Sequence, residues 1–362
     1  MIYKNFKGLK LSSLGLGCMR FPLCGENDSD IDVEAVSQMI EYAISNGINY
    51  FDTAYRYHGG ASETVVGQIL KKYPRESFYL ATKFPGFEPD FMKRVAEIFQ
   101  DQLKKCDTDY FDFYLFHNVC EKNVDAYLND DFGVYSHILA QKKAGKIRHL
   151  GFSTHGSLHT IRRFLDAYGK DLEFCQIQLN YLDWNLQNAK AKVELIRSYG
   201  LSVWVMEPVR GGALAQLDPE FEKKLKLLRP NESIPAWAFR FLQGIDGVDM
   251  ILSGMSNMTQ LKENIATFQQ ILPLCADEQA ALLSIADEMI KKDTVHCTGC
   301  SYCTERCPNS IPIPTVIRAY NEGTLPGEPG PKDCVGCRNC EVVCPQGIMI
   351  SEVMEAYRNR LS

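Results

Sequence analysis

The stretch VEAVSQMIEYAISNGINYFDTA, residues 33–54, shows the pattern that decides the fold. In residues 33–47, apolar side chains recur at intervals of three and four, as one face of an amphipathic helix requires. Residues 49–54 form a short apolar run of the kind found in buried strands. A helix that leads into a buried strand predicts an α/β fold, in which helices cover a sheet.

The same alternation continues on both sides of this stretch. Helical patterns also occupy residues 90–106 and 189–200. Eight apolar runs are predicted strands: residues 14–19, 49–54, 78–84, 112–117, 149–154, 174–180, 201–207 and 249–254. Eight such units within about 270 residues fit a closed (β/α)8 barrel, the TIM barrel fold. A doubly wound open sheet is the alternative, although no GxGxxG motif follows an early strand.

Composition and charge exclude several classes of protein. The chain has 362 residues, of which 45% are hydrophobic, so it is long enough for a barrel plus a smaller domain and too apolar to be disordered. Its net charge of -6 argues against a general nucleic-acid binder. It has no apolar run long enough to span a membrane, and residues 1–15 lack the apolar core of a signal peptide. We therefore expect a cytoplasmic protein.

The 14 cysteines are unevenly distributed, and disulfides do not persist in the cytoplasm. Eight lie in two runs, CTGCSYCTERCP (297–308) and CVGCRNCEVVCP (334–345). Both read C-x2-C-x2-C-x3-C-P, which is the bacterial two-cluster ferredoxin pattern. Zinc is the alternative, but the doubled pattern without clustered histidines favours iron and sulfur.

The spacing predicts how the cysteines divide between two [4Fe-4S] clusters. The first three cysteines of a run bind one cluster, and the fourth binds the other. One predicted set is Cys297, Cys300, Cys303 and Cys344; the other is Cys334, Cys337, Cys340 and Cys307. The remaining cysteines are expected to be small buried apolar residues: Cys18, Cys24, Cys106, Cys120, Cys175 and Cys275.

The cysteine runs also predict two domains. We place the barrel in residues 1–290 and a ferredoxin-like iron–sulfur domain in residues 291–362. Residues 315–323 are a predicted helix, and the tail, residues 351–362, is predicted to be a helix that packs on the barrel or on a partner. An oxidised cluster with four thiolates carries about -2, so we expect an anionic C-terminal face and a basic, ferredoxin-like redox partner.

Polar residues at the carboxyl ends of the predicted strands are candidates for catalysis, because active sites of such barrels lie there. Asp52 and Tyr57 follow the second strand, Lys83 ends the third and His117 ends the fourth. Taken singly, each residue also has an ordinary structural explanation.

A set of motifs in this order resembles the aldo-keto reductase family. They are KNFKGLKLSSLGLGCM (4–19), FDTAYRYHGGASETVVG (51–67), ATK (81–83), YLFHN (114–118), LGFST (150–154), QIQLNY (176–181), EPVRGG (207–212) and ILSGMSNMTQLKENI (251–265). The resemblance covers roughly residues 1–275 and includes the family's catalytic tetrad, Asp52, Tyr57, Lys83 and His117. It implies reduction of a carbonyl, with Tyr57 as the proton donor. Lys83 would lower the pKa of that phenol, Asp52 would hold Lys83, and His117 would orient the carbonyl. With the cysteine runs, the chain resembles an iron–sulfur branch of that family found mostly in anaerobes.

The resemblance implies a nicotinamide cofactor, NADP or NAD, and a small carbonyl or alcohol substrate. Ser153, Thr154 and Gln176 would hold the carboxamide. The remaining implied cofactor contacts are Cys18, Met19, Arg20, Met206, Pro208, Val209, Arg210, Gly211, Gly212, Gly254, Met255, Ser256, Gln260, Glu263 and Asn264. Met206 stands where the family has an aromatic ring. Gly254 and Gln260 replace the basic residues that bind the 2′-phosphate, so both cofactors stay open.

The substrate side is less defined by the sequence. Residues 119–138 are a predicted substrate loop. Candidate pocket walls are Phe84, Phe87, Tyr127, Phe132, Tyr181 and Trp184. Three interpretations of the whole chain remain: a nicotinamide-dependent reductase with appended clusters, a barrel with a flavin that exchanges electrons with ferredoxin through the clusters, and a non-catalytic electron-transfer module. Homo-oligomerisation also remains open.

Overall fold

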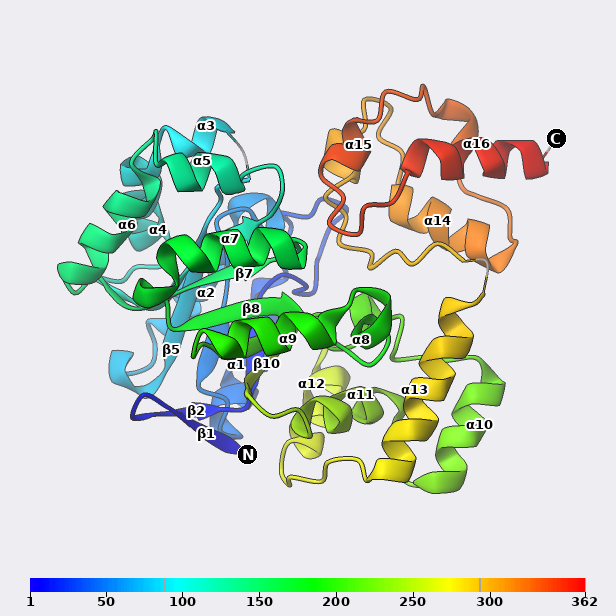
Figure 1. Ribbon diagram of the computed structural model, residues 1–362, viewed down its shortest axis with the longest axis horizontal. Coiled ribbons are helices and arrows are strands. Elements are labelled where there is room, and N and C mark those ends of the chain that lie inside the picture. Colours follow the sequence, from blue (N-terminus) through cyan, green and yellow to red (C-terminus); the bar gives the residue numbers. More distant parts are fainter. Residues whose placement is uncertain (88, 293, 362) are drawn as a thin grey trace.

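Eight parallel strands close into a barrel in the order β10-β3-β4-β5-β6-β7-β8-β9 (Figure 1). The computed structural model of the chain describes residues 1–87, 89–292 and 294–361. The barrel strands are β3 (Leu14–Gly17), β4 (Tyr50–Asp52), β5 (Tyr79–Phe84), β6 (Phe111–Val119), β7 (Ile147–Thr154), β8 (Phe174–Gln178), β9 (Ser202–Met206) and β10 (Val248–Ser253). The eight predicted strands and the closed barrel are confirmed, and the open-sheet alternative is wrong.

Helices cover the outside of the barrel. They are α1 (Val33–Ser45), α2 (Ser62–Leu70), α3 (Pro89–Met92), α4 (Val95–Lys105), α5 (Val124–Asn129), α6 (Val134–Lys143), α7 (Leu158–Tyr168), α8 (Asp183–Leu186), α9 (Ala189–Ser198), α10 (Pro219–Leu228), α11 (Ile234–Gln243), α12 (Met258–Thr267) and α13 (Ala276–Ile290). The helix predicted over 90–106 is two helices, because Arg94 leaves helical geometry at φ -117° and ψ 24°. No glycine or proline marks this break in the sequence.

The barrel interior is filled by aromatic side chains. The hairpin of β1 (Tyr3–Phe6) and β2 (Leu9–Ser12) closes one end, and the Phe6 ring lies 5.8 Å from that of Phe113 and 5.7 Å from that of Trp204. The Trp204 ring stacks on Phe174 at 3.9 Å. The barrel is therefore a packed core that is open to ligands only at the opposite end.

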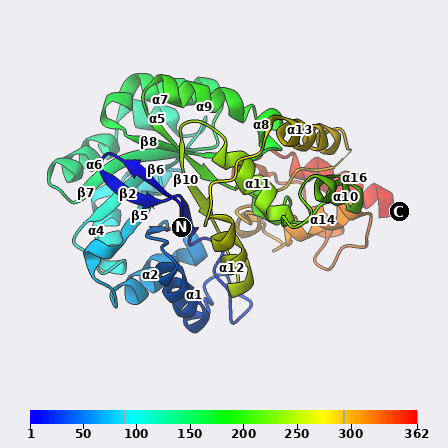
Figure 2. The same ribbon diagram turned by 90° about the horizontal axis from the view of Figure 1, so that it is seen from below.

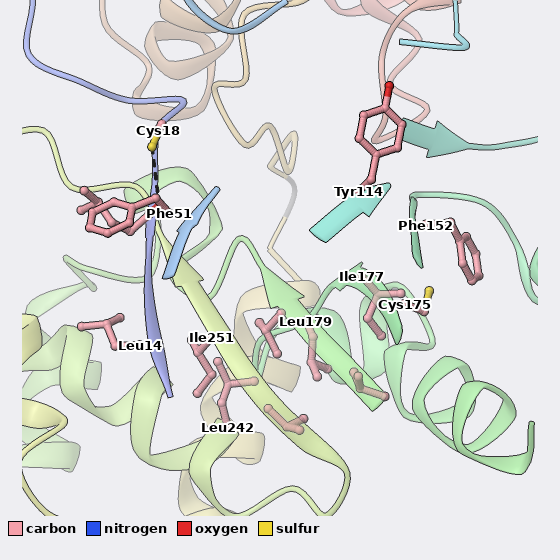
Figure 3. Close-up of a cluster of buried hydrophobic side chains, with 14 of the residues drawn as sticks. Leu14, Cys18, Phe51, Tyr114, Phe152, Cys175, Ile177, Leu179, Leu242 and Ile251 are labelled. Atoms are coloured by element: carbon pink, nitrogen blue, oxygen red, sulfur yellow. Dashed lines mark hydrogen bonds between the residues drawn. The ribbon is translucent and has the colours of Figure 1, made fainter. Parts of the chain in front are cut away.

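A second, larger core lies between the strands and the helices. Figure 3 shows part of it, with Leu14, Phe51, Ile177 and Ile251 directed away from the barrel interior. Among the six scattered cysteines, the prediction of burial is confirmed for three, Cys18, Cys106 and Cys175. It is wrong for Cys24 and Cys275, which are exposed, while Cys120 is half-buried.

The C-terminal domain is built from short helices and loops. Its helices are α14 (Ile313–Glu322), α15 (Asn339–Val342) and α16 (Ile350–Leu361). Tyr357 of α16 is buried and donates a hydrogen bond to the carbonyl of Thr324, and its ring lies 5.4 Å from that of Tyr320 in α14. The predicted packing of the tail on the barrel is therefore wrong: α16 packs within its own domain, because its apolar face meets α14 there.

The two parts of the molecule meet at the open end of the barrel. Figure 2 shows the C-terminal domain beyond α10 and α13, on the side away from α4 and α6. The helix α13 ends at Ile290, and the apolar cluster of the C-terminal domain includes Val295.

Within the described part of the chain, no helix has the length and apolarity that a membrane crossing requires.

Candidate active site and cluster sites

The four tetrad residues meet at the open end of the barrel. Asp52 ends β4, Lys83 and His117 lie in β5 and β6, and Tyr57 begins the 3-10 turn η1 (Tyr57–Gly60). All four are buried. The Lys83 ammonium donates hydrogen bonds to the Asp52 carboxylate, to the carbonyl of Thr53 at 2.8 Å and to the Tyr57 hydroxyl at 3.3 Å. The structure thus brings together the residues that the sequence places on three different strands and a turn.

His117 faces Tyr57 across the site. The two rings are perpendicular, with centroids 5.9 Å apart, and the Phe87 ring packs against His117 at 5.3 Å. Burial, followed by the positive charge of Lys83, lowers the pKa of His117 well below its ordinary value. The imidazole is therefore neutral near pH 7, and its Nδ1 atom has no hydrogen-bond partner among the described residues.

The environment of Tyr57 differs from the sequence expectation. Burial, with the nearby Asp52 carboxylate, raises the pKa of the Tyr57 phenol well above its ordinary value. The pKa is therefore not lowered as the sequence predicts: desolvation of the phenolate outweighs the opposing positive charge, which comes from Arg20. The phenol consequently stays protonated, which is the form that a proton donor to an alkoxide must have.

A polar network behind Lys83 was not foreseen. Gln102 of α4 donates to the backbone carbonyl of Lys83 at 3.0 Å and to Glu63 of α2 at 2.9 Å. Thr82 donates to the same carboxylate at 2.6 Å, and the Tyr114 hydroxyl donates to Gln102 at 2.6 Å. These buried groups fix the end of β5 and hence the Lys83 side chain. Isolated polar residues in helices give no sequence signal for such a role.

A cavity of about 1090 Å³ opens next to the tetrad. Asp52, Tyr57 and His117 line it. Most of the predicted cofactor residues line it as well: Met19, Arg20, Ser153, Gln176, Met206, Pro208, Val209, Gly211, Gly212, Gly254, Met255, Ser256, Gln260, Glu263 and Asn264. The Gln176 Oε1 atom is buried without a partner, so it is an acceptor that the amide of a bound carboxamide could satisfy.

Three predicted cofactor residues do not line the cavity. The Cys18 thiol is fully buried and points back to the carbonyl of Leu16 at 3.6 Å. The Thr154 hydroxyl donates to the carbonyl of Val119 at 2.5 Å, in the wall behind Ser153. Arg210 does not line the cavity either, and its guanidinium pairs with Asp183 at 3.1 Å.

Among the six aromatic residues proposed as pocket walls, only Phe87 lines the cavity. Phe84, Tyr127 and Tyr181 belong to the core between strands and helices. Trp184 packs on Phe241 with ring centroids 5.5 Å apart, and Phe132 is exposed. Of the predicted substrate loop, Cys120 and two neighbouring residues reach the cavity. The aromatic residues were misassigned because core and pocket positions have the same composition.

The C-terminal domain forms one wall of the same cavity. Thr298, Cys300, Tyr302, Cys344 and Gln346 line it. Burial raises the pKa of Tyr302 well above its ordinary value, and the largest electrostatic contribution to this shift comes from Tyr57. A second phenol from the C-terminal domain therefore lies close to the tetrad. Its only sequence signal is that Tyr302 is the one aromatic residue within a cysteine run.

Arg210 and Gln346 fasten the C-terminal domain to the barrel. Besides its ion pair with Asp183, the Arg210 guanidinium donates to the carbonyl of His296 at 2.8 Å and to Gln346 Oε1 at 2.9 Å. The Gln346 amide in turn donates to Gln178 Oε1 at 2.8 Å. Arg210 thus contacts chain segments on both sides of the cysteine runs, a role that its motif position did not indicate.

Two further contacts bring the domains close together. Arg20 donates to the carbonyl of Thr298 at 3.1 Å and lies 3.9 Å from the Glu207 carboxylate. Gly211 has φ +63°, and a Cβ atom at this position would lie 1.8 Å from the carbonyl oxygen of Thr298. Only glycine fits here, because any side chain would push the C-terminal domain off the loop.

The cysteines form two groups that cross between the runs. Cys297, Cys300, Cys303 and Cys344 line one small cavity beside α14. Cys307, Cys334, Cys337 and Cys340 line another, next to α16. Within the described residues, no three His, Cys, Asp or Glu side chains are arranged to hold a metal ion. The ligands of a cubane bind different iron atoms and so lie further apart than those of a single ion.

Comparisons with known proteins match two parts of the chain to two different families. Residues 13–287 match the aldo/keto reductase family, and residues 296–349 match a 4Fe-4S dicluster domain. The NADH-specific methylglyoxal reductase of Escherichia coli is 26% identical over 330 residues, which cover 78% of this chain and 97% of that protein. A probable aldo-keto reductase of Glycine max is 29% identical over 217 residues, which cover 57% of this chain and 58% of that protein.

Solved structures with a similar fold include aldo-keto reductases. A holo aldo-keto reductase from Bacillus halodurans has 25% identity and a TM-score of 0.62, over 79% of this chain and 96% of that one. A thermostable aldo-keto reductase has 22% identity and a TM-score of 0.63, over 79% and 100%. With the family match extending over most of the chain and the tetrad assembled at the mouth of the barrel, the protein belongs to the aldo/keto reductase family.

Proposed function

We propose that the protein interconverts a small carbonyl compound and its alcohol, with a nicotinamide cofactor in the barrel cavity and Tyr57 as the general acid and base. The observation that carries this proposal is the hydrogen-bonded arrangement of Lys83 with Asp52 and Tyr57 at the wall of the cavity. Membership of the family supports oxidoreductase chemistry, and the proposal adds the residues and the cofactor class.

The chain's own residues divide the work as follows. When bound, the nicotinamide supplies or accepts a hydride. Tyr57, held protonated by burial, donates its proton to the oxygen of the carbonyl and recovers it from the alcohol in the reverse direction. Neutral His117 offers a ring N–H to the same oxygen and orients it. Lys83 stabilises the phenolate left behind, and Asp52 keeps Lys83 in place.

The polar groups in the cavity are suited to a dinucleotide. Ser153 and Gln176 lie next to the tetrad, where the carboxamide would bind. Ser256, Gln260 and Glu263 line the cavity where the adenosine end would lie, and the backbone N–H of Ser256 donates to Gln260 Oε1 at 2.8 Å. The proposal covers NADP and NAD alike, because neither Gly254 nor Gln260 supplies a positive charge for a 2′-phosphate.

We further propose that residues 1–290 and 291–362 are the two domains and that the second carries two [4Fe-4S] clusters. The grouping of the cysteines supports the crossed ligand sets: Cys297, Cys300, Cys303 and Cys344 for one cluster, and Cys334, Cys337, Cys340 and Cys307 for the other. When bound, each cluster would supply one electron at a time.

A second candidate function gives the clusters a part in turnover. Cys300 and Cys344, from the first cysteine group, line the cavity that also holds Tyr57. A redox group bound there would adjoin the first cluster, and a flavin can accept single electrons where a nicotinamide accepts them poorly. In that case a ferredoxin-like partner would deliver electrons to the second cluster. The third candidate, a non-catalytic electron-transfer module, does not explain why the four tetrad residues are assembled beside the cavity.

The test starts from protein purified without oxygen. A visible spectrum shows whether a flavin is bound, and NAD(P)H oxidation with an aldehyde measures turnover. Replacing Tyr57 with Phe should lower kcat by about 10²–10⁴-fold, the contribution typical of a positioned proton donor. Tyr55→Phe, two residues earlier and packed on Phe91 outside the cavity, is the matched control. Equal activity of both variants would refute the tetrad assignment, and a flavin band without NAD(P)H turnover would favour the second candidate.

A further inference from the structure

Lys192 is a buried lysine in the wall of the cavity, and the reaction proposed at Tyr57 does not involve it. It belongs to the first turn of α9, only 9% of its surface is exposed, and it lines the cavity. No other described residue forms an ion pair within 4 Å or a hydrogen bond with its ammonium. Lys190, two residues earlier on the same helix, is exposed and does not line the cavity.

The nearest carboxylates are engaged elsewhere. Asp183 attracts Lys192 electrostatically, but its oxygens are bound to Arg210 at 3.1 Å and to the amides of Gln178 and Asn180 at 2.7 Å. Because Arg210 already balances this carboxylate, Asp183 leaves the charge of Lys192 without a partner of its own.

Glu121 is the second carboxylate that faces Lys192. Its Oε1 atom accepts hydrogen bonds from the backbone N–H of Ser157 at 2.7 Å and from the Thr160 hydroxyl at 2.8 Å, at the start of α7. These hydrogen bonds lower the pKa of Glu121 to about 2 against the opposing effect of burial. Glu121 is thus held by these hydrogen bonds at the start of α7, and it is not within ion-pair distance of Lys192.

A buried ammonium without a partner is unfavourable. Burial lowers the pKa of Lys192, while the two carboxylates oppose this shift only from a distance. His155, which lines the cavity in the same region, adds no negative charge: its pKa is about 4, so it is neutral near pH 7. An anionic oxygen group that enters the cavity would supply the partner that the chain itself does not provide.

We propose that Lys192 binds a carboxylate or phosphate group of the substrate, so that the enzyme acts on carbonyl compounds that carry a negative charge away from the reacting carbon. This inference rests on the proposed function and names its substrate class. Tyr57 and His117 approach the cavity from η1 and β6, whereas Lys192 approaches from α9, so the carbonyl and the anionic group are held from different walls.

The first experiment compares matched aldehydes in the full, cluster-loaded protein. The pairs are 4-carboxybenzaldehyde against methyl 4-formylbenzoate, and glyceraldehyde 3-phosphate against glyceraldehyde; the two pairs separate carboxylate from phosphate recognition. The wild type should favour one charged member, and Lys192→Met should reduce the charged-to-neutral ratio of kcat/KM about ten-fold or more, chiefly through KM, as expected for a lost hydrogen bond to a charged group. Lys192→Arg should retain the ratio, and Lys190→Met is the control.

The second experiment measures binding without turnover. Calorimetry with benzoate, inorganic phosphate and the neutral benzamide should show anion binding to the wild type and to Lys190→Met that is lost in Lys192→Gln. Anion binding that depends on Lys192, without aldehyde reduction, would uphold the subsite and overturn the proposed function. Aldehyde reduction with an unchanged charge ratio in folded Lys192→Met would overturn the subsite alone. A raised KM for NAD(P)H in place of the aldehyde would also overturn it, because Lys192 would then bind the cofactor.

Discussion

The barrel and the C-terminal domain are held together in different ways. The barrel has a continuous ladder of eight paired strands and two apolar cores rich in Leu, Ile, Phe and Trp. The described residues of the C-terminal domain form no strand, and their apolar cluster includes the cysteines themselves, with Cys303 and Cys340 buried in it. A domain of about 70 residues with so small a core generally needs a metal or a disulfide.

We infer that burial of apolar side chains stabilises the barrel, whereas binding of the clusters by the cysteines stabilises the C-terminal domain. The two also meet at the cavity, where the C-terminal domain supplies a wall and the barrel supplies the tetrad. Loss of the clusters should therefore affect the catalytic site indirectly, through the wall, and leave the barrel strands intact.

The largest effect is expected from cysteine substitutions that test the crossed ligand sets. Cys344→Ser should remove one cluster, about four iron atoms per chain. Adding Cys297→Ser should remove no further iron, because both residues serve the same cluster, whereas adding Cys334→Ser should remove the rest. Iron analysis and visible absorption of oxygen-free protein measure this outcome.

The cysteine series has its control in the exposed Cys275, whose replacement by Ser should leave the iron content unchanged. Clusters that each used one run alone would give the opposite pattern, with Cys344→Ser and Cys334→Ser affecting the same cluster. Circular dichroism of the variants should show the barrel retained, and protease sensitivity should appear beyond Ile290, where α13 ends.

The next effect concerns Arg210, which fastens the two domains. Arg210→Met removes the partner of buried Asp183 and the hydrogen bonds to His296 and Gln346. Breaking a buried ion pair from one side typically destabilises by about 3–5 kcal/mol. Denaturant unfolding should show that loss, together with increased proteolysis between the domains.

Arg197→Met is the matched control, because Arg197 forms an exposed pair with Asp246 at 2.5 Å. Its loss should change stability by less than about 1 kcal/mol. If Arg210→Met lowered the free energy of unfolding no more than Arg197→Met, the proposed role of Arg210 in holding the domains together would be wrong. The alternative, that Arg210 of the EPVRGG motif contacts the cofactor, would then be favoured.

These two regions also show what a sequence can and cannot predict. The strands could be predicted because each is a short apolar run in the sequence. The tetrad residues could be predicted because they are polar residues at or just after the ends of those runs. The grouping of the cysteines could be predicted because the spacing within each run is itself the signal; that these groups are the ligand sets stays a prediction. The contacts of Arg210 and the positions of Tyr302 and Lys192 in the cavity wall could not be predicted, because they depend on how one domain packs on another and how α9 packs on the barrel.

A smaller effect tests the barrel alone. The unfolded chain protonates His117 near pH 6.5, but in the folded protein burial and Lys83 lower its pKa well below that value. The unfolded state therefore binds more protons below pH 6.5, and the contribution of His117 to stability, complete above that pH, falls by up to about 1.4 kcal/mol for each pH unit below it.

His117→Asn should remove this part of the acid sensitivity, so the stability difference between wild type and variant should shrink as the pH falls from 7 to 5. Urea unfolding of the barrel at several pH values measures it. His159→Asn, at an exposed position on α7, is the control and should leave the slope unchanged. A parallel pH dependence of wild type and His117→Asn would show that His117 takes up its proton in the folded barrel as easily as in the unfolded chain.

The smallest effect lies at the rim of the domain interface. Arg56 and Glu305 form an ion pair at 3.0 Å, with side chains 34% and 49% exposed. Because water and salt screen such a pair, Glu305→Gln should weaken the attachment of the C-terminal domain by less than about 1 kcal/mol, and the difference from wild type should vanish at high salt. Proteolysis between the domains at low and high salt checks this. If Glu305→Gln destabilised the interface as much as Arg210→Met, exposed ion pairs would contribute as much to it as buried ones. The contrast between the buried Arg210 contacts and the exposed Arg56–Glu305 pair would then be wrong.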